Sequence, residues 1–187
     1  MVLSSMESNG FLKIGIWRRW SGKGVSGVSN KHNNKAAKYR SQVDMWRDQF
    51  GKDYALRNLR STKETDEDLY KRYYGVTRTE MNYEFLECID RSTRILEVGT
   101  HTGVQLMLLR EMGFRNLYGI ELQEESIKLS RIHNSRNITL INGSVFELPF
   151  KDKTFDIVFT SGVLIHISPS DIFDAMKEIY RCTNGYI

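Results

Sequence analysis

Two glycines four positions apart lie in residues 96–103 (LEVGTHTG), at the end of a short apolar run. Glycine adopts backbone angles that other residues avoid, so Gly99 and Gly103 would let the chain turn tightly and approach a ligand. A helix that begins after such a turn leaves its first N–H groups free to bind the same ligand. The GxGxxG spacing is absent, which counts against a dinucleotide phosphate site. The loop therefore indicates a ligand site without identifying the ligand.

An acidic residue lies at a suitable distance beyond this loop. Glu121 ends the run NLYGIE (116–121), 22 positions after Gly99. A carboxylate about 20 residues past a glycine loop can accept hydrogen bonds from the hydroxyls of a ribose. The alternative is a solvated acid at the end of a strand, but together with the glycine loop the ribose role is the better interpretation.

A third segment, residues 142–150 (NGSVFELPF), follows another predicted strand. Ser144, the backbone of Val145 and the ring of Phe146 could recognise an adenine and stack on it. The alternative for Phe146 is ordinary packing in the core.

The elements that position these motifs alternate between strands and helices. Strands are expected at 94–99, 116–121, 137–141, 154–160 and 185–187, and helices at 103–112, 124–133 and 168–181. Gly113 would stop the first helix, and Ser168 would cap the third with Pro169 at its first position. This alternation predicts βαβ units and a parallel sheet, whose ligands bind at the carboxyl ends of the strands.

The part of the chain before residue 93 differs in composition and in hydrophobic pattern. Residues 1–40 contain eight basic residues and one acid, so they could bind nucleic acid or form a solvated, flexible arm. Residues 41–92 are expected to form a helical cap, with helical spacing over 43–56, an acidic start to a helix at 64–75, and a helix at 77–90 capped by Thr79. The three predicted units are therefore 1–40, 41–92 and 93–187.

Composition excludes several classes of protein. No run of about 18 apolar residues predicts a membrane span, and the first 20 residues lack a secretory signal pattern. The two cysteines have no CxxC spacing, so we expect neither a disulfide framework nor a zinc site, and a cytoplasmic location.

The ordered set LEVGTHTG, GIEL (119–122), GSVFELPF (143–150) and FDIVFTSGVLIHI (155–167) resembles the class I methyltransferases that use S-adenosylmethionine. The resemblance implies an α/β Rossmann-like three-layer sandwich with a mostly parallel sheet. It also implies roles in cofactor binding. These roles are the methionine end for Glu97, Gly99 and Gly103, the ribose for Glu121, the adenine for Ser144, Val145 and Phe146, and further cofactor contacts for Leu122 and Ser161.

Two positions depart from the family pattern. His101 replaces the middle glycine of the loop; its ring could contact the carboxylate of the cofactor, or it could serve only as a turn residue. Ser144 stands where an acid is often found, which removes charged recognition of the adenine amine.

A narrower resemblance begins at Trp46. Residues 46–58 (WRDQFGKDYALRN) are similar to the opening of methylases associated with pseudaminic acid biosynthesis, as are TSGVLIHISP (160–169) and EIYRC (178–182). The resemblance implies a small-molecule acceptor related to a nonulosonic acid or another cell-surface sugar. The predicted strand at 154–160 is not followed by the motif [DN]PP[YFW], which argues against methylation of nucleic-acid bases. We therefore expect no nucleic acid as partner, and we expect no membrane either.

The catalytic residues are not fixed by these motifs, but three candidates stand out. His166 could remove a proton from the acceptor, or could be a packed histidine. Tyr54 and Arg57 could close over the cofactor, and Arg57 could bind a sugar carboxylate in bidentate fashion or form only a surface salt bridge.

The methyltransferase sheet normally continues beyond a fifth strand, so the resemblance predicts a sheet truncated at the start of strand five. Its exposed edge could be covered by a second copy or by a partner. An inactive cofactor-binding fragment is the alternative function, and a nicotinamide-dependent oxidoreductase is a weaker one, because the GTHTG loop counts against it.

Overall fold

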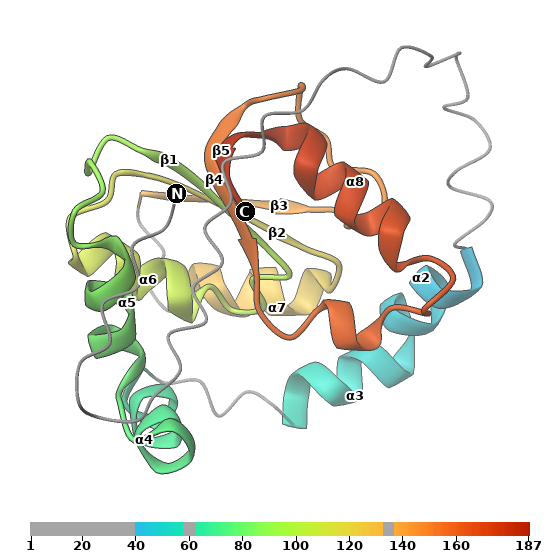
Figure 1. Ribbon diagram of the computed structural model, residues 1–187. Coiled ribbons are helices and arrows are strands. Elements are labelled where there is room, and N and C mark those ends of the chain that lie inside the picture. Colours follow the sequence, from blue (N-terminus) through green and yellow to red (C-terminus); the bar gives the residue numbers. More distant parts are fainter. Residues whose placement is uncertain (1–39, 58–62, 133–136) are drawn as a thin grey trace.

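Five parallel strands form one sheet in the computed structural model, which describes residues 40–57, 63–132 and 137–187 (Figure 1). The strands are β1 (Arg94–Val98), β2 (Asn116–Glu121), β3 (Ile138–Asn142), β4 (Phe155–Thr160) and β5 (Thr183–Tyr186), in the order β3-β2-β1-β4-β5. The predicted α/β class and parallel sheet are confirmed. The strand order reverses between β1 and β4, which is where ligands bind in open sheets of this kind.

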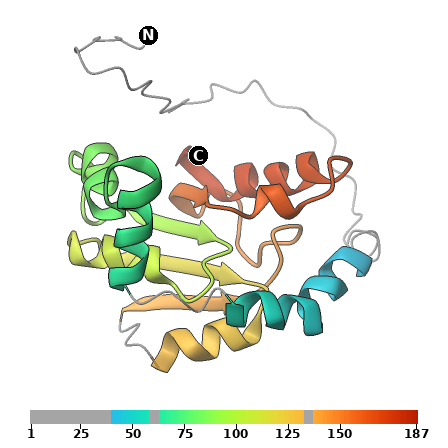
Figure 2. The ribbon, with the colours of Figure 1, turned by 90° about the horizontal axis from the view of Figure 1, so that it is seen from below.

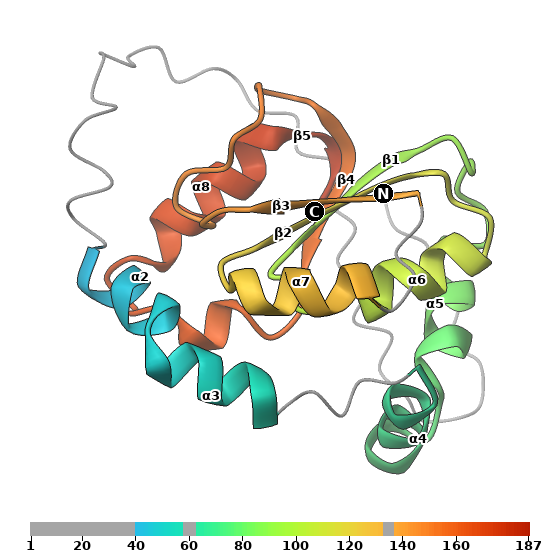
Figure 3. The same ribbon diagram turned by 180° about the vertical axis from the view of Figure 1, so that it is seen from behind.

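Helices cover both faces of the sheet, because side chains on a strand alternate between the faces. On β1, Ile95 packs with Leu106 and Leu109 of α6 (Val104–Glu111), whereas Leu96 packs on the other face, in a cluster that includes Ile179. Ile179 belongs to α8 (Ile172–Cys182), and α7 (Glu124–Ile132) lies on the same face as α6 (Figure 3). The result is the predicted three-layer sandwich.

The residues before β1 form four described helices. These are α2 (Arg40–Arg47), α3 (Gln49–Arg57), α4 (Lys63–Tyr74) and α5 (Arg78–Leu86). The helical pattern expected over 43–56 is thus divided at Asp48, and α3 lies against α7 (Figures 2 and 3). The predicted basic arm, residues 1–40, lies outside the described residues except for its last position.

Two predicted helix caps are wrong. The N-cap of α5 is Thr77: its hydroxyl accepts a hydrogen bond from Glu80 N–H, and the Glu80 carboxylate accepts one from Thr77 N–H. This reciprocal capping box leaves Thr79 inside the helix, where its hydroxyl donates to Glu67 of α4 (2.6 Å).

The third core helix also begins later than predicted. The N–H groups of Asp171 and Ile172 both donate to the carbonyl of Ser168, so this residue belongs to a turn that precedes α8. Asp171 occupies the cap position, and Pro169 lies in the turn rather than at the first helical position. None of the described helices combines the length and apolar composition that crossing a bilayer requires.

Candidate active site

The loop between β1 and α6 has the backbone conformation that its glycines predict. Gly99 and Gly103 both have φ near +78°, and His101 between them has φ near +51°. A Cβ at Gly99 would overlap a methyl group of Val163, in the loop after β4. Glycine at position 99 therefore lets the loops after β1 and β4 approach each other at the carboxyl edge of the sheet.

Glu121 is held at the end of β2 by two backbone groups. Its Oε2 accepts from His101 N–H (2.8 Å) and its Oε1 accepts from Gln123 N–H (2.8 Å). These contacts fix the plane of the carboxylate and tie it to the glycine loop. Each oxygen keeps a second lone pair, so the group can still accept hydrogen bonds from ligand hydroxyls.

Glu97 is a buried carboxyl next to the same loop, with only 3% of the residue exposed. Burial raises its pKa to about 7, although the Thr100 hydroxyl, which donates to Oε2 (2.7 Å), and the positive charge of Arg78 oppose this shift. A cationic group placed beside Glu97 would restore the ionised form, so the site favours an ammonium or sulfonium ligand.

Helices α4 and α5 contribute a charged pair, Asp66 and Arg78, that was not predicted from the sequence. Arg78 donates to the Asp66 carboxylate (3.0 Å), lies over the ring of Tyr70 (4.6 Å) and reaches Ser161 Oγ (3.5 Å). Ser161, which was expected to contact the cofactor, lies in the loop after β4 and is thus linked to Arg78 of α5. Nothing local in the sequence signals this contact, because the residues come from separate elements.

The structure of the loop after β3 is compatible with both of the roles considered for it. Phe146 is buried and packs against Ala175 of α8, as the core-packing alternative predicts. Its N–H donates to Ser144 Oγ (3.3 Å), and Ser144, Val145 and Phe146 all line the cavity described below. Packing in the core and facing a ligand are therefore compatible for Phe146.

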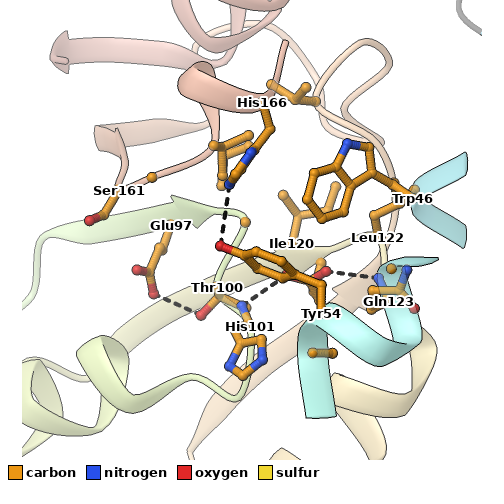
Figure 4. A pocket seen from close by; sticks show the side chains of 18 of the residues that line it. Trp46, Tyr54, Glu97, Thr100, His101, Ile120, Leu122, Gln123, Ser161 and His166 are labelled. Carbon is orange, nitrogen blue, oxygen red and sulfur yellow. Dashed lines mark hydrogen bonds between the residues drawn. The ribbon is translucent and has the colours of Figure 1, made fainter. Parts of the chain in front are cut away.

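An aromatic cluster joins the N-terminal helices to the loop after β4. The rings of Trp46 and His166 lie 4.7 Å apart, and Tyr54 Oη lies 3.4 Å from His166 Nε2. Gln42 Nε2 donates to the carbonyl of His166 (2.7 Å), which fixes the backbone at this point. Figure 4 shows Tyr54 and His166 pointing toward each other over the cavity.

Most of these groups line one cavity of about 820 Å³, a volume within the range of small-molecule sites. It is lined by twelve of the thirteen predicted site residues: Tyr54, Arg57, Glu97, Gly99, His101, Glu121, Leu122, Ser144, Val145, Phe146, Ser161 and His166. Gly103 does not line it; this residue lies beside the cavity at the N-cap of α6. Other residues that the sequence did not assign to the site also line the cavity, among them the polar residues Gln42, Asp66, Arg78, Thr100 and Gln123.

Comparisons with known proteins show which proteins this chain resembles. Residues 96–185 match the family model described as a methyltransferase domain. An uncharacterized methyltransferase of Staphylococcus carnosus (strain TM300) is 30% identical over 86 residues, which cover 46% of this chain and 40% of that protein. An uncharacterized methyltransferase of Schizosaccharomyces pombe (strain 972) is 30% identical over 118 residues, which cover 54% of this chain and 41% of that protein.

Solved structures agree. The crystal structure of the PH0226 protein from Pyrococcus horikoshii OT3 matches 57% of this chain and 51% of that chain, with 26% identity and a TM-score of 0.51. Residues 96–185, about half of the chain, are therefore similar to a methyltransferase domain. The chain spans about two fifths of the length of the two curated relatives named above.

The residues that line the cavity fit S-adenosylmethionine, the cofactor that this similarity implies. Glu97 supplies the buried carboxyl that an ammonium group requires, and Glu121 supplies fixed acceptors for ribose hydroxyls. His101 Nε2 and Gln123 Nε2 are buried atoms with no hydrogen-bond partner among the described residues, and both residues line the cavity. Buried polar groups are rarely left unpaired, so these atoms are positioned for a polar ligand.

Proposed function

We propose that this chain transfers the methyl group of S-adenosylmethionine to an oxygen of a small, anionic, sugar-like acceptor, such as a nonulosonic acid or another cell-surface sugar. One observation carries the proposal. The Glu121 carboxylate, fixed by the glycine loop, and the Tyr54–His166 pair line the same cavity. The carboxylate that would hold the cofactor ribose and the pair that would transfer a proton therefore belong to the same cavity.

The cofactor side of the cavity is formed by the carboxyl ends of β1, β2 and β3. Glu97 would hold the amino group of the methionine end, Glu121 the ribose hydroxyls, and the 144–146 segment the adenine. When bound there, S-adenosylmethionine supplies a methyl group on a positively charged sulfur. The chain itself must then orient the acceptor in line with that methyl group, which accounts for much of the rate in such transfers.

The acceptor side is formed by the N-terminal helices and the loop after β4. An acceptor hydroxyl near His166 Nε2 would give up its proton to this nitrogen as its oxygen forms the new bond to carbon. Tyr54 Oη, already 3.4 Å from the same nitrogen, can position that hydroxyl or share its hydrogen bond. His166 would gain a positive charge with this proton, which would balance the positive charge that leaves the bound cofactor with its methyl group.

Arg57 is placed to bind an anionic acceptor. It lines the cavity, is exposed, and forms no ion pair with any carboxylate of the described residues. A guanidinium binds a carboxylate in bidentate fashion, whereas the other cavity arginine, Arg78, is already paired with Asp66. The carboxylate of a nonulosonic acid has the charge and shape that Arg57 would recognise.

The test is calorimetric titration of the purified chain with S-adenosylhomocysteine, with NAD⁺ as the control ligand. Binding of S-adenosylhomocysteine alone supports the cofactor site, and no binding by a folded chain contradicts it. Transfer of labelled methyl groups is then measured with a nonulosonic acid and with a neutral sugar. Transfer to the acid alone supports the acceptor class. Binding without transfer to either sugar would favour a non-catalytic cofactor-binding role.

A further inference from the structure

Gln123 occupies a place where helices usually begin with a different kind of residue. It immediately precedes α7, and its carbonyl accepts from Ile127 N–H (3.3 Å), as the carbonyl of an N-cap residue does. Serine, threonine, aspartate and asparagine are preferred at this position because their short side chains cap the helix. The longer carboxamide of Gln123 lines the cavity (Figure 4).

The carboxamide of Gln123 is buried but has no partner. Only 6% of the residue is exposed, and Nε2 makes no hydrogen bond within the described part of the chain. A buried donor without an acceptor destabilises a protein, because it has lost its hydrogen bonds to water and gained none in return. A ligand in the cavity that brings an acceptor to this nitrogen would remove that cost.

The neighbour of Gln123 indicates which acceptor this is. Gln123 N–H donates to Glu121 Oε1 (2.8 Å), so its side chain starts beside the carboxylate that would hold the ribose. A ribose hydroxyl can donate its hydrogen to a carboxylate and accept another hydrogen bond at the same oxygen. Glu121 offers the acceptor and Gln123 offers the donor for such a pair of bonds.

We propose that Gln123 donates a hydrogen bond to a ribose hydroxyl of the cofactor and so is a second residue, with Glu121, that selects an intact ribose. This inference rests on the proposed function, because it requires that the cavity binds S-adenosylmethionine. It concerns a residue outside the motifs that carry the family resemblance.

Helix α3 closes over this residue. A Cβ at Gly51 would overlap both the Trp46 carbonyl and the Gln123 carboxamide, so the backbone of α3 approaches the amide directly. Glycine at position 51 therefore lets α3 cover Gln123 and keep bulk water from satisfying the amide. A ribose that fixes Gln123 would also support α3, which carries Tyr54 and Arg57.

The experiment compares the affinities of two ligands for the full chain by calorimetry: S-adenosylhomocysteine and its analogue that lacks both ribose hydroxyls. Q123M keeps the length of the side chain but removes the donor. It should weaken binding of S-adenosylhomocysteine about five- to tenfold, as expected for one lost hydrogen bond, and leave binding of the analogue unchanged. Q49M is the matched control, since Gln49 is exposed on α3 and bonds only to Asp53 among the described residues; it should leave both affinities unchanged.

Equal affinities of Q123M and the unmodified chain for S-adenosylhomocysteine, or equal weakening for both ligands, would overturn the proposal. Failure of the unmodified, folded chain to bind S-adenosylhomocysteine would instead contradict the proposed function. Circular dichroism checks the folding of each variant. If Q123M does not fold, Q123E, which keeps the shape but replaces the donor by an acceptor, should show the same ligand-dependent loss.

Discussion

The hydroxyl of Tyr54 lies 3.4 Å from Nε2 of His166, although the two residues are 112 positions apart in the sequence. Tyr54 belongs to α3 and His166 to the short helix η1 (Leu164–His166), which follows β4. The ring of Trp46 and the amide of Gln42 also contact His166. The N-terminal helices therefore contribute side chains to the cavity and do more than cover it.

This contact predicts a separation between catalysis and cofactor binding. H166Q should lower kcat by about 10²–10⁴, the usual effect of losing a general base, with little change in the affinity for S-adenosylhomocysteine. Y54F should lower kcat less, because His166 remains. Single-turnover methyl transfer and calorimetry measure the two quantities. An unchanged kcat in H166Q would rule out the proton-transfer role.

Arg57 should act on the acceptor alone. R57A is expected to raise the KM of an anionic acceptor about tenfold or more, because a charge-assisted hydrogen bond contributes roughly 1.5–3 kcal/mol. The affinity for S-adenosylhomocysteine should not change. Arg47, an exposed residue at the end of α2 that does not line the cavity, provides the control R47A. Identical kinetics for R57A and R47A would show that Arg57 does not bind the acceptor.

Glu121 should act on the cofactor. E121A removes the acceptor expected for the ribose and frees two backbone N–H groups, so binding of S-adenosylhomocysteine should weaken about 10- to 100-fold. E125A, which removes an exposed carboxylate of the adjacent helix, should bind like the unmodified chain. Calorimetry at constant pH and salt compares the three proteins. Equal affinities for S-adenosylhomocysteine would show that Glu121 does not bind the cofactor.

Much of the fold could be predicted because its strands leave a strong local signal. The run NLYGIE predicts β2 with the bounds that the structure shows, and the buried run at 94–99 predicts β1. Helix starts were harder to predict. Thr77 and Glu80 have the spacing of a capping box, and the contact of Thr79 with α4, which decides between the two threonines, is tertiary.

The site was predictable where its residues belong to strand-end loops, and less so elsewhere. Glu97 and Glu121 follow from the motifs, since parallel strands bring their carboxyl ends to one edge of the sheet. Arg78 reaches Ser161 across 83 positions, and no periodicity signals such a contact. Gln123 did leave a local signal, because a long amide stands where a short capping residue is usual, but its burial beneath α3 is visible only in the structure.

The raised pKa of Glu97 predicts how stability depends on pH. Burial raises this pKa to about 7, so between the ordinary value of a glutamate and pH 7 the folded chain holds a proton that the unfolded chain releases. The stability that this proton gives is present at low pH and is lost as pH rises through 7. E97Q cannot ionise and should therefore gain stability relative to the unmodified chain, by roughly 1–3 kcal/mol, between pH 5 and pH 8. Urea unfolding at the two pH values measures this gain, and an equal difference at both would show that Glu97 is already ionised at pH 5.

Glu178 should determine the stability of the loop that follows β3. Its carboxylate is buried and accepts hydrogen bonds from Leu148 N–H (3.1 Å) and from the guanidinium of Arg181 (2.8 Å), while Arg181 also donates to the carbonyls of Leu148 and Phe150. E178A leaves both the Leu148 amide and the arginine without this partner. Because Arg181 is partly exposed and keeps its other acceptors, the main cost is the lost hydrogen bonds of the buried carboxylate, so the free energy of unfolding should fall by about 1–3 kcal/mol.

The matched control for E178A is K177A on the same helix. Lys177 forms an exposed pair with Asp174, and such pairs contribute about 0–1 kcal/mol, so K177A should unfold almost like the unmodified chain. Urea denaturation followed by circular dichroism compares the three proteins. The Glu178 network holds the segment that carries Val145 and Phe146, so E178A should also weaken binding of S-adenosylhomocysteine at temperatures where it remains folded. A loss of stability no larger than that of K177A would mean that the loop is held by its apolar contacts alone.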